Sequence, residues 1–281
     1  MRLIAIFMLI LSCQATVFSQ KKDDNGLYKA QYECIWSVKF IDDTIKMIPG
    51  IEDRFILQVG DDFSYQYGYH SQQRDSMFRS FKNPEDMPNF IKNHLELMRN
   101  SNLRESGTMR YNAFGPVKLV KDYKAKKIIV NDRISSYSFA YEENLIPQNW
   151  EIQDDTITIA GYVCQKAVCY YRGRSYEAWF ASEIPISEGP WKFHGLPGLI
   201  LYLYDTQHHY EFELVELKNI DSIIDVSLII SNKWKKIDRK ELLRMQWGKQ
   251  GDLIKSTEMA KIGLSNTPVI RNHDYIELDY K

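Results

Sequence analysis

The stretch Glu183-Ile-Pro-Ile-Ser-Glu-Gly-Pro-Trp-Lys-Phe-His-Gly-Leu-Pro-Gly-Leu-Ile-Leu-Tyr-Leu-Tyr-Asp205 organises the rest of the chain. It holds three of the nine prolines and three of the fourteen glycines. Proline fixes φ and glycine supplies φ > 0, so the backbone here is tightly constrained. Pro197-Gly198 predicts a type II turn. The apolar run over residues 199–204 predicts a strand that is buried on both faces.

Large rings in the loop before this strand need something to pack on. We therefore treat the loop as the candidate ligand-binding or interaction site, formed by Trp191, Phe193, His194, Gly195, Leu196, Pro197 and Gly198. A rigid loop can hold the His194 imidazole near a pocket mouth. In the alternative, which we favour, Trp191 and Phe193 plug one end of the sheet and His194 faces solvent.

Two arginines flank Gly173 at a predicted hairpin tip, and they complete the candidate site. Arg172 and Arg174 have the planar geometry that recognises a carboxylate or phosphate bidentately. The simpler interpretation, which we favour, is a pair of ordinary solvated loop arginines.

The hexapeptide Gly195-Leu-Pro-Gly-Leu-Ile200 resembles the signature of the GLPGLI family. The likeness extends through residues 161–167, 171–174, 178–180, 184–186 and 189–193. The resemblance implies an exported protein of a Gram-negative bacterium, in a family with no established function. It brings no catalytic residues to carry over to this chain.

Composition limits the classes of function. The chain has 281 residues, 44% hydrophobic and 13% aromatic, which is enough for one large domain or two small ones. Its formal charge of −1 gives no electrostatic case for nucleic acid as a partner. We interpret the basic run over residues 121–127 as a solvated turn.

The N-terminus is typical of a leader. Residues 1–19 combine a charged start with an apolar run too short to span a bilayer, and we favour cleavage before Gln20. A competing interpretation lipidates Cys13 and tethers the chain to a membrane, which is the only membrane contact we expect. Residues 20–26 form a flexible lead-in. We therefore expect an exported protein, either periplasmic or associated with the outer membrane.

Three cysteines lie outside the leader, so at least one of them stays unpaired. Cys164 and Cys169 fall on opposite faces of one predicted strand and cannot pair with each other. A bridge between Cys34 and Cys164 is possible, but we favour buried free thiols. No metal site and no cofactor are predicted, because the cysteines are not accompanied by a paired histidine or a C-x-x-C motif.

Alternating residues predict an antiparallel sheet. The alternation is nearly complete over residues 28–40, and residues 55–69 predict a hairpin around Gly60. Further strands are expected at 111–121, 127–130, 135–141, 150–152, 157–171, 176–180, 210–214 and 220–230. The doublet Asp154-Asp155 is assigned to a turn.

The fold class is therefore mainly β: an antiparallel curled sheet or half-barrel of about ten strands over residues 27–230. One internal helix is expected near residues 84–100, where Asn83 and Pro84 can begin it. Residues 231–281 are expected to form a C-terminal helical extension, with its helix between about 233 and 259.

Common catalytic motifs are missing: we find no G-x-S-x-G, H-E-x-x-H, G-x-G-x-x-G or P-loop. The first hypothesis is a non-enzymatic envelope protein that holds an apolar or amphipathic ligand, a lipid or a peptide, between the sheet and the helix around Phe90. The alternative is an interaction module that docks on an outer-membrane or secretion partner through the Trp191 loop or an exposed strand edge. A hydrolase using His194 or Cys164 is the least favoured.

Overall fold

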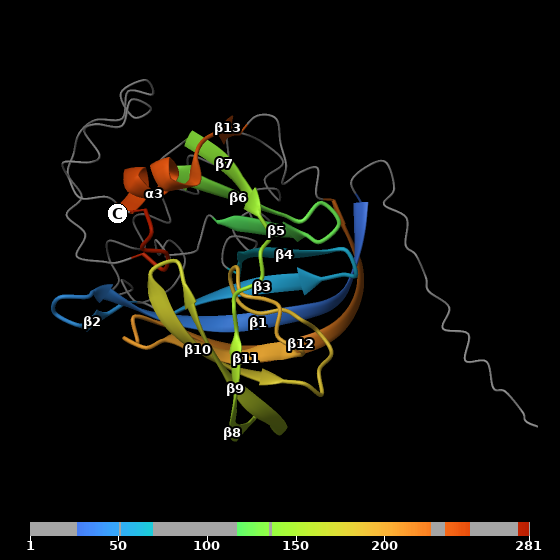
Figure 1. Cartoon of the computed structure of the whole chain (residues 1–281). Coiled ribbons are helices and arrows are strands. Elements are labelled where there is room, and N and C mark those ends of the chain that lie inside the picture. The colour runs from blue at the N-terminus through green and yellow to red at the C-terminus, as the bar shows by residue number, and fades with distance from the viewer. Residues whose placement is uncertain are drawn as a thin grey trace, which may run out of the picture.

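The protein is built on β1 (Leu27–Asp43), the long strand at the centre of a curled sheet (Figure 1). The computed structural model describes residues 27–50, 52–69, 117–134, 137–225, 234–247 and 275–280. Successive residues of a strand point to opposite faces, so Cys34, Trp36 and Val38 of β1 face the main core, while Ile35 packs into a smaller cluster on the other face. The predicted mainly-β antiparallel fold is confirmed, with thirteen strands in these described ranges rather than about ten.

Two arms extend from β1, and each is a chain of antiparallel neighbours. The first arm runs β3 (Asp53–Val59), β4 (Phe63–Gly68), β5 (Lys118–Asp122), β6 (Lys127–Ile134) and β7 (Tyr137–Asn144). The second arm runs β12 (Tyr210–Asp225), β11 (Leu199–Asp205), β10 (Arg174–Ala181), β9 (Tyr162–Tyr171) and β8 (Glu151–Ile159). Short β2 (Ile48–Pro49) pairs with the end of β1, and β13 (Lys235–Lys236) pairs in parallel with β7.

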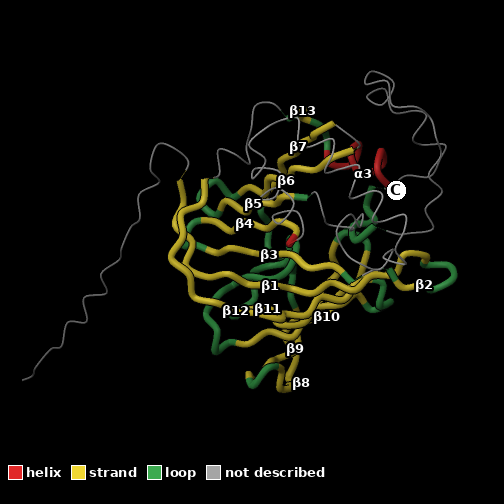
Figure 2. The backbone as a smooth tube through the Cα atoms, turned by 180° about the vertical axis from the view of Figure 1, so that it is seen from behind, coloured by secondary structure: helices red, strands yellow, loops and turns green. Residues whose placement is uncertain are grey.

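The short connection between β7 and β8 forces the sheet to curl. These strands are consecutive in sequence, yet ten strand spacings separate them in the sheet order. In a flat sheet that separation would be roughly 48 Å. Residues 145–150 can bridge only about 25 Å. The two arms therefore bend toward each other without closing, as the views from front and back show (Figures 1 and 2).

The core lies between the bent arms. Large, fully buried side chains of the core come from β1, from both arms and from the segment between β10 and β11: Trp36, Phe55, Phe139, Tyr176, Phe180, Trp191, Phe193 and Tyr210. Helix α3 (Arg239–Trp247) packs its Leu242, Leu243 and Met245 onto the same core. This helix of nine residues lies within the predicted range of about 233–259 and confirms that the chain has a helix near its C-terminus.

Several local predictions are wrong. Residues 157–171 are not one strand, because Ala160 and Gly161, with φ of 50° and 87°, turn β8 back into β9. Two consecutive residues at φ > 0 are typical of a hairpin turn that matches the strand twist. The predicted turn at Asp154-Asp155 is instead an irregularity inside β8, between Ile152 and Thr156. Residues 220–225 continue β12 rather than forming another strand.

Other expectations fall outside the described residues: the leader, the lead-in, the helix near 84–100 and the strand residues 111–116 and 226–230. In the part of the chain that the structure describes, no helix is both long and apolar enough to cross a membrane. The segment Tyr275–Tyr280, inside the predicted helical extension, is not helical and packs against the core.

The predicted type II turn at Pro197-Gly198 is wrong. That turn needs φ > 0 at its glycine, but Gly198 is not among the glycines with positive φ. A Cβ at Gly198 would instead lie 2.2 Å from the carbonyl oxygen of Ala181. Glycine is needed here because the backbone before β11 crosses directly over the end of β10.

We expect Gly198→Ala to lower the free energy of unfolding by about 2–3 kcal/mol, because the Ala181 backbone must move. Gly161→Ala is the matched control: its added Cβ meets nothing within 4 Å, so only the φ of 87° is strained. That strain costs about 1 kcal/mol. Urea unfolding followed by tryptophan fluorescence compares the two. Equal losses in both variants would show that the close approach is unimportant.

Candidate functional site

Residues 183–198, between β10 and β11, form a plug between the two arms, and its large side chains are buried. Trp191, Lys192, Phe193 and Leu196 are each at most 1% exposed. The plug is tied to the first arm by Gln66 of β4, whose Oε1 accepts a hydrogen bond from the backbone N–H of Trp191 at 2.8 Å. The favoured plug interpretation of Trp191 and Phe193 agrees with this placement.

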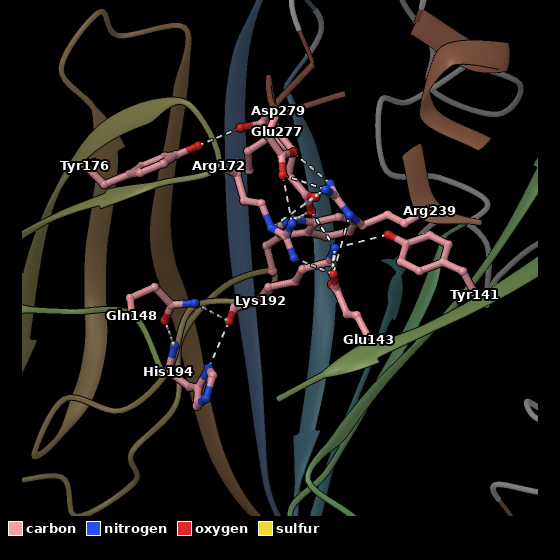
Figure 3. A network of polar contacts seen from close by, with 12 residues as sticks. Tyr141, Glu143, Gln148, Arg172, Tyr176, Lys192, His194, Arg239, Glu277 and Asp279 are labelled. Carbon is pink, nitrogen blue, oxygen red and sulfur yellow. Dashed lines mark hydrogen bonds and ion pairs between the residues drawn. The ribbon is translucent and has the colours of Figure 1, made fainter. Parts of the chain in front are cut away.

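The plug is also tied to the connection between β7 and β8 (Figure 3). Gln148 donates to the carbonyl oxygen of Lys192 at 3.1 Å and accepts from the backbone N–H of His194 at 3.0 Å. The indole N–H of Trp150 donates to the carbonyl oxygen of His194 at 2.9 Å. One side chain therefore satisfies two buried backbone groups that a loop would otherwise leave unpaired.

Packing holds an unusual backbone conformation at Trp191, whose φ is 56°. A bulky residue at φ > 0 is strained by roughly 1–3 kcal/mol and persists only where its surroundings fix it. The Trp191 ring meets Tyr275 edge-on at 6.3 Å, and its N–H donates to Glu277 at 3.1 Å. The plug thus depends on the C-terminal segment.

Lys192 is the centre of a buried ion-pair network (Figure 3). Its Nζ lies 2.5 Å from Glu143 Oε1 and 2.6 Å from Glu277 Oε1, and it donates to the Tyr141 hydroxyl at 3.1 Å. The Lys192 side chain is 0% exposed and that of Glu277 is 1% exposed. A buried charge is tolerated only when it is paired in this way.

Two arginines extend the network toward the surface. Arg239 of α3 donates to Glu277 at 2.6 Å and to both carboxylate oxygens of Asp279, at 2.9 and 2.6 Å. Arg172, in the turn between β9 and β10, donates to Asp279 at 2.8 Å and to Glu143 at 2.6 Å. Three cations thus meet three carboxylates, and two of the carboxylates belong to the C-terminal segment.

These contacts keep the groups charged. Burial opposes the charge on Lys192, but Glu277 and Glu143 outweigh it and raise the pKa of Lys192. Burial likewise raises the pKa of Glu277, but Lys192 and Arg239 lower it more, so the pKa lies below its usual value. Burial also raises the pKa of Asp279, but its hydrogen bonds and ion pairs with Arg239 and Arg172 together outweigh this effect and lower the pKa to about 2. The network is electrostatically satisfied rather than poised to exchange a proton.

Lys121 forms a second buried pair, so the interpretation of residues 121–127 as a solvated turn is wrong at its first residue. Its Nζ lies 2.5 Å from Glu188 Oε2 and 3.1 Å from the carbonyl oxygen of Phe193, and the side chain is 0% exposed. Tyr123 donates its hydroxyl hydrogen to the other oxygen of Glu188. Burial lowers the pKa of Lys121, and Glu188 opposes that shift.

The plug interpretation expected His194 to face solvent, and this part of it is wrong. It is only 5% exposed, and its Nδ1 lies 3.0 Å from the carbonyl oxygen of Lys192. Burial, with the nearby charge of Lys121, lowers its pKa, so the imidazole is neutral near pH 7. No contact of this imidazole with a carboxylate is found among the described residues.

Arg172 and Arg174 are not the solvated loop arginines that we favoured. Arg174 is 3% exposed, pairs with Asp205 at 3.1 Å, and donates to the carbonyl oxygen of Tyr275 at 3.1 Å. Both do recognise carboxylates, but the carboxylates are the protein's own. Of the other predicted site residues, Leu196 and Gly198 are buried, while Gly195 and Pro197 are exposed.

The three cysteines are free and buried, as favoured. Burial raises the pKa of Cys34 and of Cys164, and it raises that of Cys169 to about 12. A nucleophilic thiol needs the opposite shift. Within the described ranges, no group of three or more His, Cys, Asp or Glu side chains could hold a metal ion.

Sequence patterns did not predict most residues of the network or of the second pair: Glu143, Lys192, Arg239, Glu277 and Asp279 in the network, and Lys121 and Glu188 in the pair. One signal was present at the C-terminus. Ile276, Glu277, Leu278 and Asp279 alternate apolar and acidic residues, a pattern typical of an extended segment with one packed face.

We expect Lys192→Met to lower the free energy of unfolding by about 3–5 kcal/mol, because it leaves buried carboxylates without their counter-ion. Adding Glu277→Gln should recover part of that loss. The matched control is Lys166→Met, which breaks a pair with Glu177 at the surface and should cost at most about 1 kcal/mol. Urea unfolding measures all three. Equal losses for the two lysine variants would contradict the importance of the buried network.

Acid should weaken the same network. The folded-state pKa of Asp279 is about 2, below its usual value of 3.8. Its contribution is therefore complete above about pH 4 and is lost as the pH falls toward 2. We expect Asp279→Asn to be less stable than wild type by about 1–2 kcal/mol at pH 7, with the difference vanishing near pH 2. Parallel stability curves from pH 7 to 2 would contradict this assignment.

Comparison with known proteins supports the fold and leaves the activity open. A family model described as "Protein of unknown function (Porph_ging)" matches residues 172–202, about a ninth of the chain. Two solved structures, "Structure of PNGF-II in C2 space group" and "Structure of PNGF-II in P21 space group", are similar with TM-scores of 0.50 and 0.51. Each is 14% identical over 78% of this chain and 33% of that chain, so this chain spans about a third of their length. At this identity the likeness concerns the fold alone. No curated protein matches the chain.

Proposed function

We propose that this is an exported, non-enzymatic interaction module of the cell envelope, belonging to the GLPGLI family. It binds a basic segment of a partner protein on the outer face of its second arm. The hexapeptide over residues 195–200 supports the family, the match over residues 172–202 to a family of unknown function is consistent with it, and the leader-like N-terminus supports the location. One observation carries the binding role: aromatic rings and carboxylates alternate with core residues across β10, β11 and β12.

The interior gives less support to the hypothesis of an apolar ligand. The plug lies between the arms, and its Trp191 and Phe193 occupy the centre of the core. Phe193 contacts the rings of Tyr176, Tyr171 and Trp150 at 4.6, 5.4 and 6.0 Å. In the described part of the molecule, these rings pack against one another instead of lining a ligand cavity. Burial of Trp191 likewise removes it as a docking anchor.

The outer surface of the second arm has different chemistry. We define the acidic–aromatic face as Trp179, Tyr202, Tyr204, Glu177 and Glu211. Trp179 lies opposite Tyr202, and Tyr204 lies between Glu177 and Glu211 across the strands. The rings of Tyr202 and Tyr204 are 5.2 Å apart. This arrangement exposes electron-rich rings beside carboxylates.

Hydrogen bonds hold the tyrosine rings and the carboxylates in place. The Tyr204 hydroxyl donates to Glu177 at 2.7 Å, and the Tyr202 hydroxyl donates to Glu211 at 3.3 Å. The His208 ring stacks on Tyr204 at 4.8 Å. Little side-chain entropy is therefore left to lose on binding.

Lys166 shows how this face holds a cation. Its Nζ lies 2.7 Å from Glu177 and 5.9 Å from the centre of the Trp179 ring. An ammonium between a ring face and a carboxylate gains cation–π attraction together with an ion pair. At Tyr204 and Glu211 the same place is held by His208, whose ring stacks on Tyr204 and whose Nδ1 lies 2.7 Å from Glu211, so a Lys or Arg side chain of a partner would displace His208 to make these contacts.

The neighbouring edge extends the acidic character. Strand β8 ends the sheet order and carries Glu151, Asp154 and Asp155 without a basic residue. Acids and an irregular pairing protect such an edge from a second copy, which would bring like charges together. The same acids attract a basic segment.

A peptide of ten alternating Thr and Lys residues, labelled with fluorescein, tests the proposal. Anisotropy should show saturable binding to residues 20–281 that weakens as salt rises. The double variant Glu177→Gln, Glu211→Gln should weaken binding about 5–30-fold, because two ion pairs of about 0.5–1 kcal/mol each are lost.

Two controls define the outcome. Glu142→Gln changes an exposed acid on β7 and should leave the affinity unchanged. The corresponding Thr–Glu peptide should not bind. If the Thr–Lys peptide does not bind, or binds the double variant as tightly as wild type, the proposed surface is wrong.

A further inference from the structure

The C-terminal segment Tyr275–Tyr280 is held like a bound peptide. Its backbone is gripped by side chains and one carbonyl from elsewhere in the chain: Tyr176 donates to the Ile276 carbonyl at 2.8 Å, and Arg244 donates to the Tyr280 carbonyl at 3.0 Å. The N–H of Leu278 donates to the carbonyl oxygen of Arg172 at 2.7 Å. These three partners, Tyr176, Arg244 and Arg172, all lie outside the segment, as the residues of a receptor do around a bound peptide.

The site that receives the segment is cationic. Arg172, Lys192 and Arg239 come from three different elements, and all three contact Glu277 or Asp279 (Figure 3). Glu143 is the carboxylate that the site itself supplies to these cations. Without Glu277 and Asp279, three positive charges would face one negative charge.

Carboxylate recognition here is specific in geometry. Glu277 accepts from Trp191 and Arg239 and lies 2.6 Å from the Lys192 Nζ. Asp279 accepts from both terminal nitrogens of Arg239 and from Arg172. Planar guanidinium groups that meet both oxygens of a carboxylate favour that group over a point anion.

The site is also shaped for the residue between the two acids. A Cβ at Gly173 would lie 2.8 Å from the Cβ of Leu278, so only glycine leaves room for this side chain. Tyr275, Ile276 and Tyr280 are at most 3% exposed and anchor both ends of the segment. Shape and charge together define the pattern Glu-x-Asp between apolar residues.

We propose that Arg172, Lys192 and Arg239 form a recognition site for an extended acidic peptide of this pattern, and that residues 275–280 occupy it in cis. The site takes the same segment in trans when the covalent link is cut. This inference is independent of the acidic–aromatic face, which has the opposite charge and lies on other residues.

Cutting the link after folding tests the proposal in the full chain. A specific protease site is inserted between Asn272 and His273, the folded protein is cleaved, and a fluorescein-labelled peptide of residues 275–281 is added. We expect the labelled peptide to displace the cleaved tail and to bind with a stoichiometry of one. The uncleaved protein should not bind it, because its own tail fills the site.

Variants identify the contacts. Peptides with Glu277→Gln or Asp279→Asn should bind at least about 10-fold more weakly, since each loses a hydrogen-bonded ion pair. Lys192→Gln in the cleaved chain should weaken binding similarly. The matched change Lys166→Gln, away from the tail, should not.

Each result decides the matter. If the cleaved protein keeps its near-ultraviolet circular dichroism but binds no peptide, there is no recognition site. If cleavage unfolds the protein, excess peptide must restore the native signal, and failure to restore it also overturns the proposal. Equal affinity for the wild-type peptide and for the Glu277→Gln and Asp279→Asn peptides would show that only apolar contacts hold the segment, and it would overturn the proposal of a carboxylate-recognition site.

Discussion

The ammonium group of Lys192, buried between Glu143 and Glu277, is the constraint on which the arrangement depends. It joins the plug to the end of the first arm and to the C-terminal segment. Arg172 and Arg239 bring in the second arm and α3 through the same carboxylates. A buried network gains little net free energy over apolar packing, but breaking it is costly. The plug, the two arms, α3 and the C-terminal segment must therefore all be in their native positions for the network to form.

The curl of the sheet makes this meeting possible. Because residues 145–150 are too few to cross a flat sheet, β7 and β8 approach each other, and the plug fills the space between the arms. The sheet stays open, and its two edges differ in what protects them from pairing with another chain. β13 pairs with β7, whereas β8 has an irregular pairing and three acids, features that discourage edge-to-edge association.

Alternation along the chain predicted the sheet, because one buried face imposes a period of two that local sequence records. It failed between residues 157 and 171, since Ala160-Gly161 interrupts apolar residues that continue on both sides. The cluster of buried ion pairs could not be predicted from local sequence, because its members are far apart in the chain. Arg172 and its partner Asp279 are 107 positions apart, and nothing near Arg172 distinguishes it from a solvated arginine. The strained φ of Trp191 is likewise set by its tertiary neighbours.

The plug, which holds the most recognisable part of the sequence, keeps its large side chains Trp191, Lys192 and Phe193 inside the protein. The family match over residues 172–202 includes Arg172, Lys192 and Gly198, whose roles here are ion pairing inside the protein and close backbone packing. These residues of the signature report how the plug is held. Binding chemistry has to be sought where reactive or charged groups can be reached. That condition is met at the acidic–aromatic face, and at the cationic site once its own tail has left.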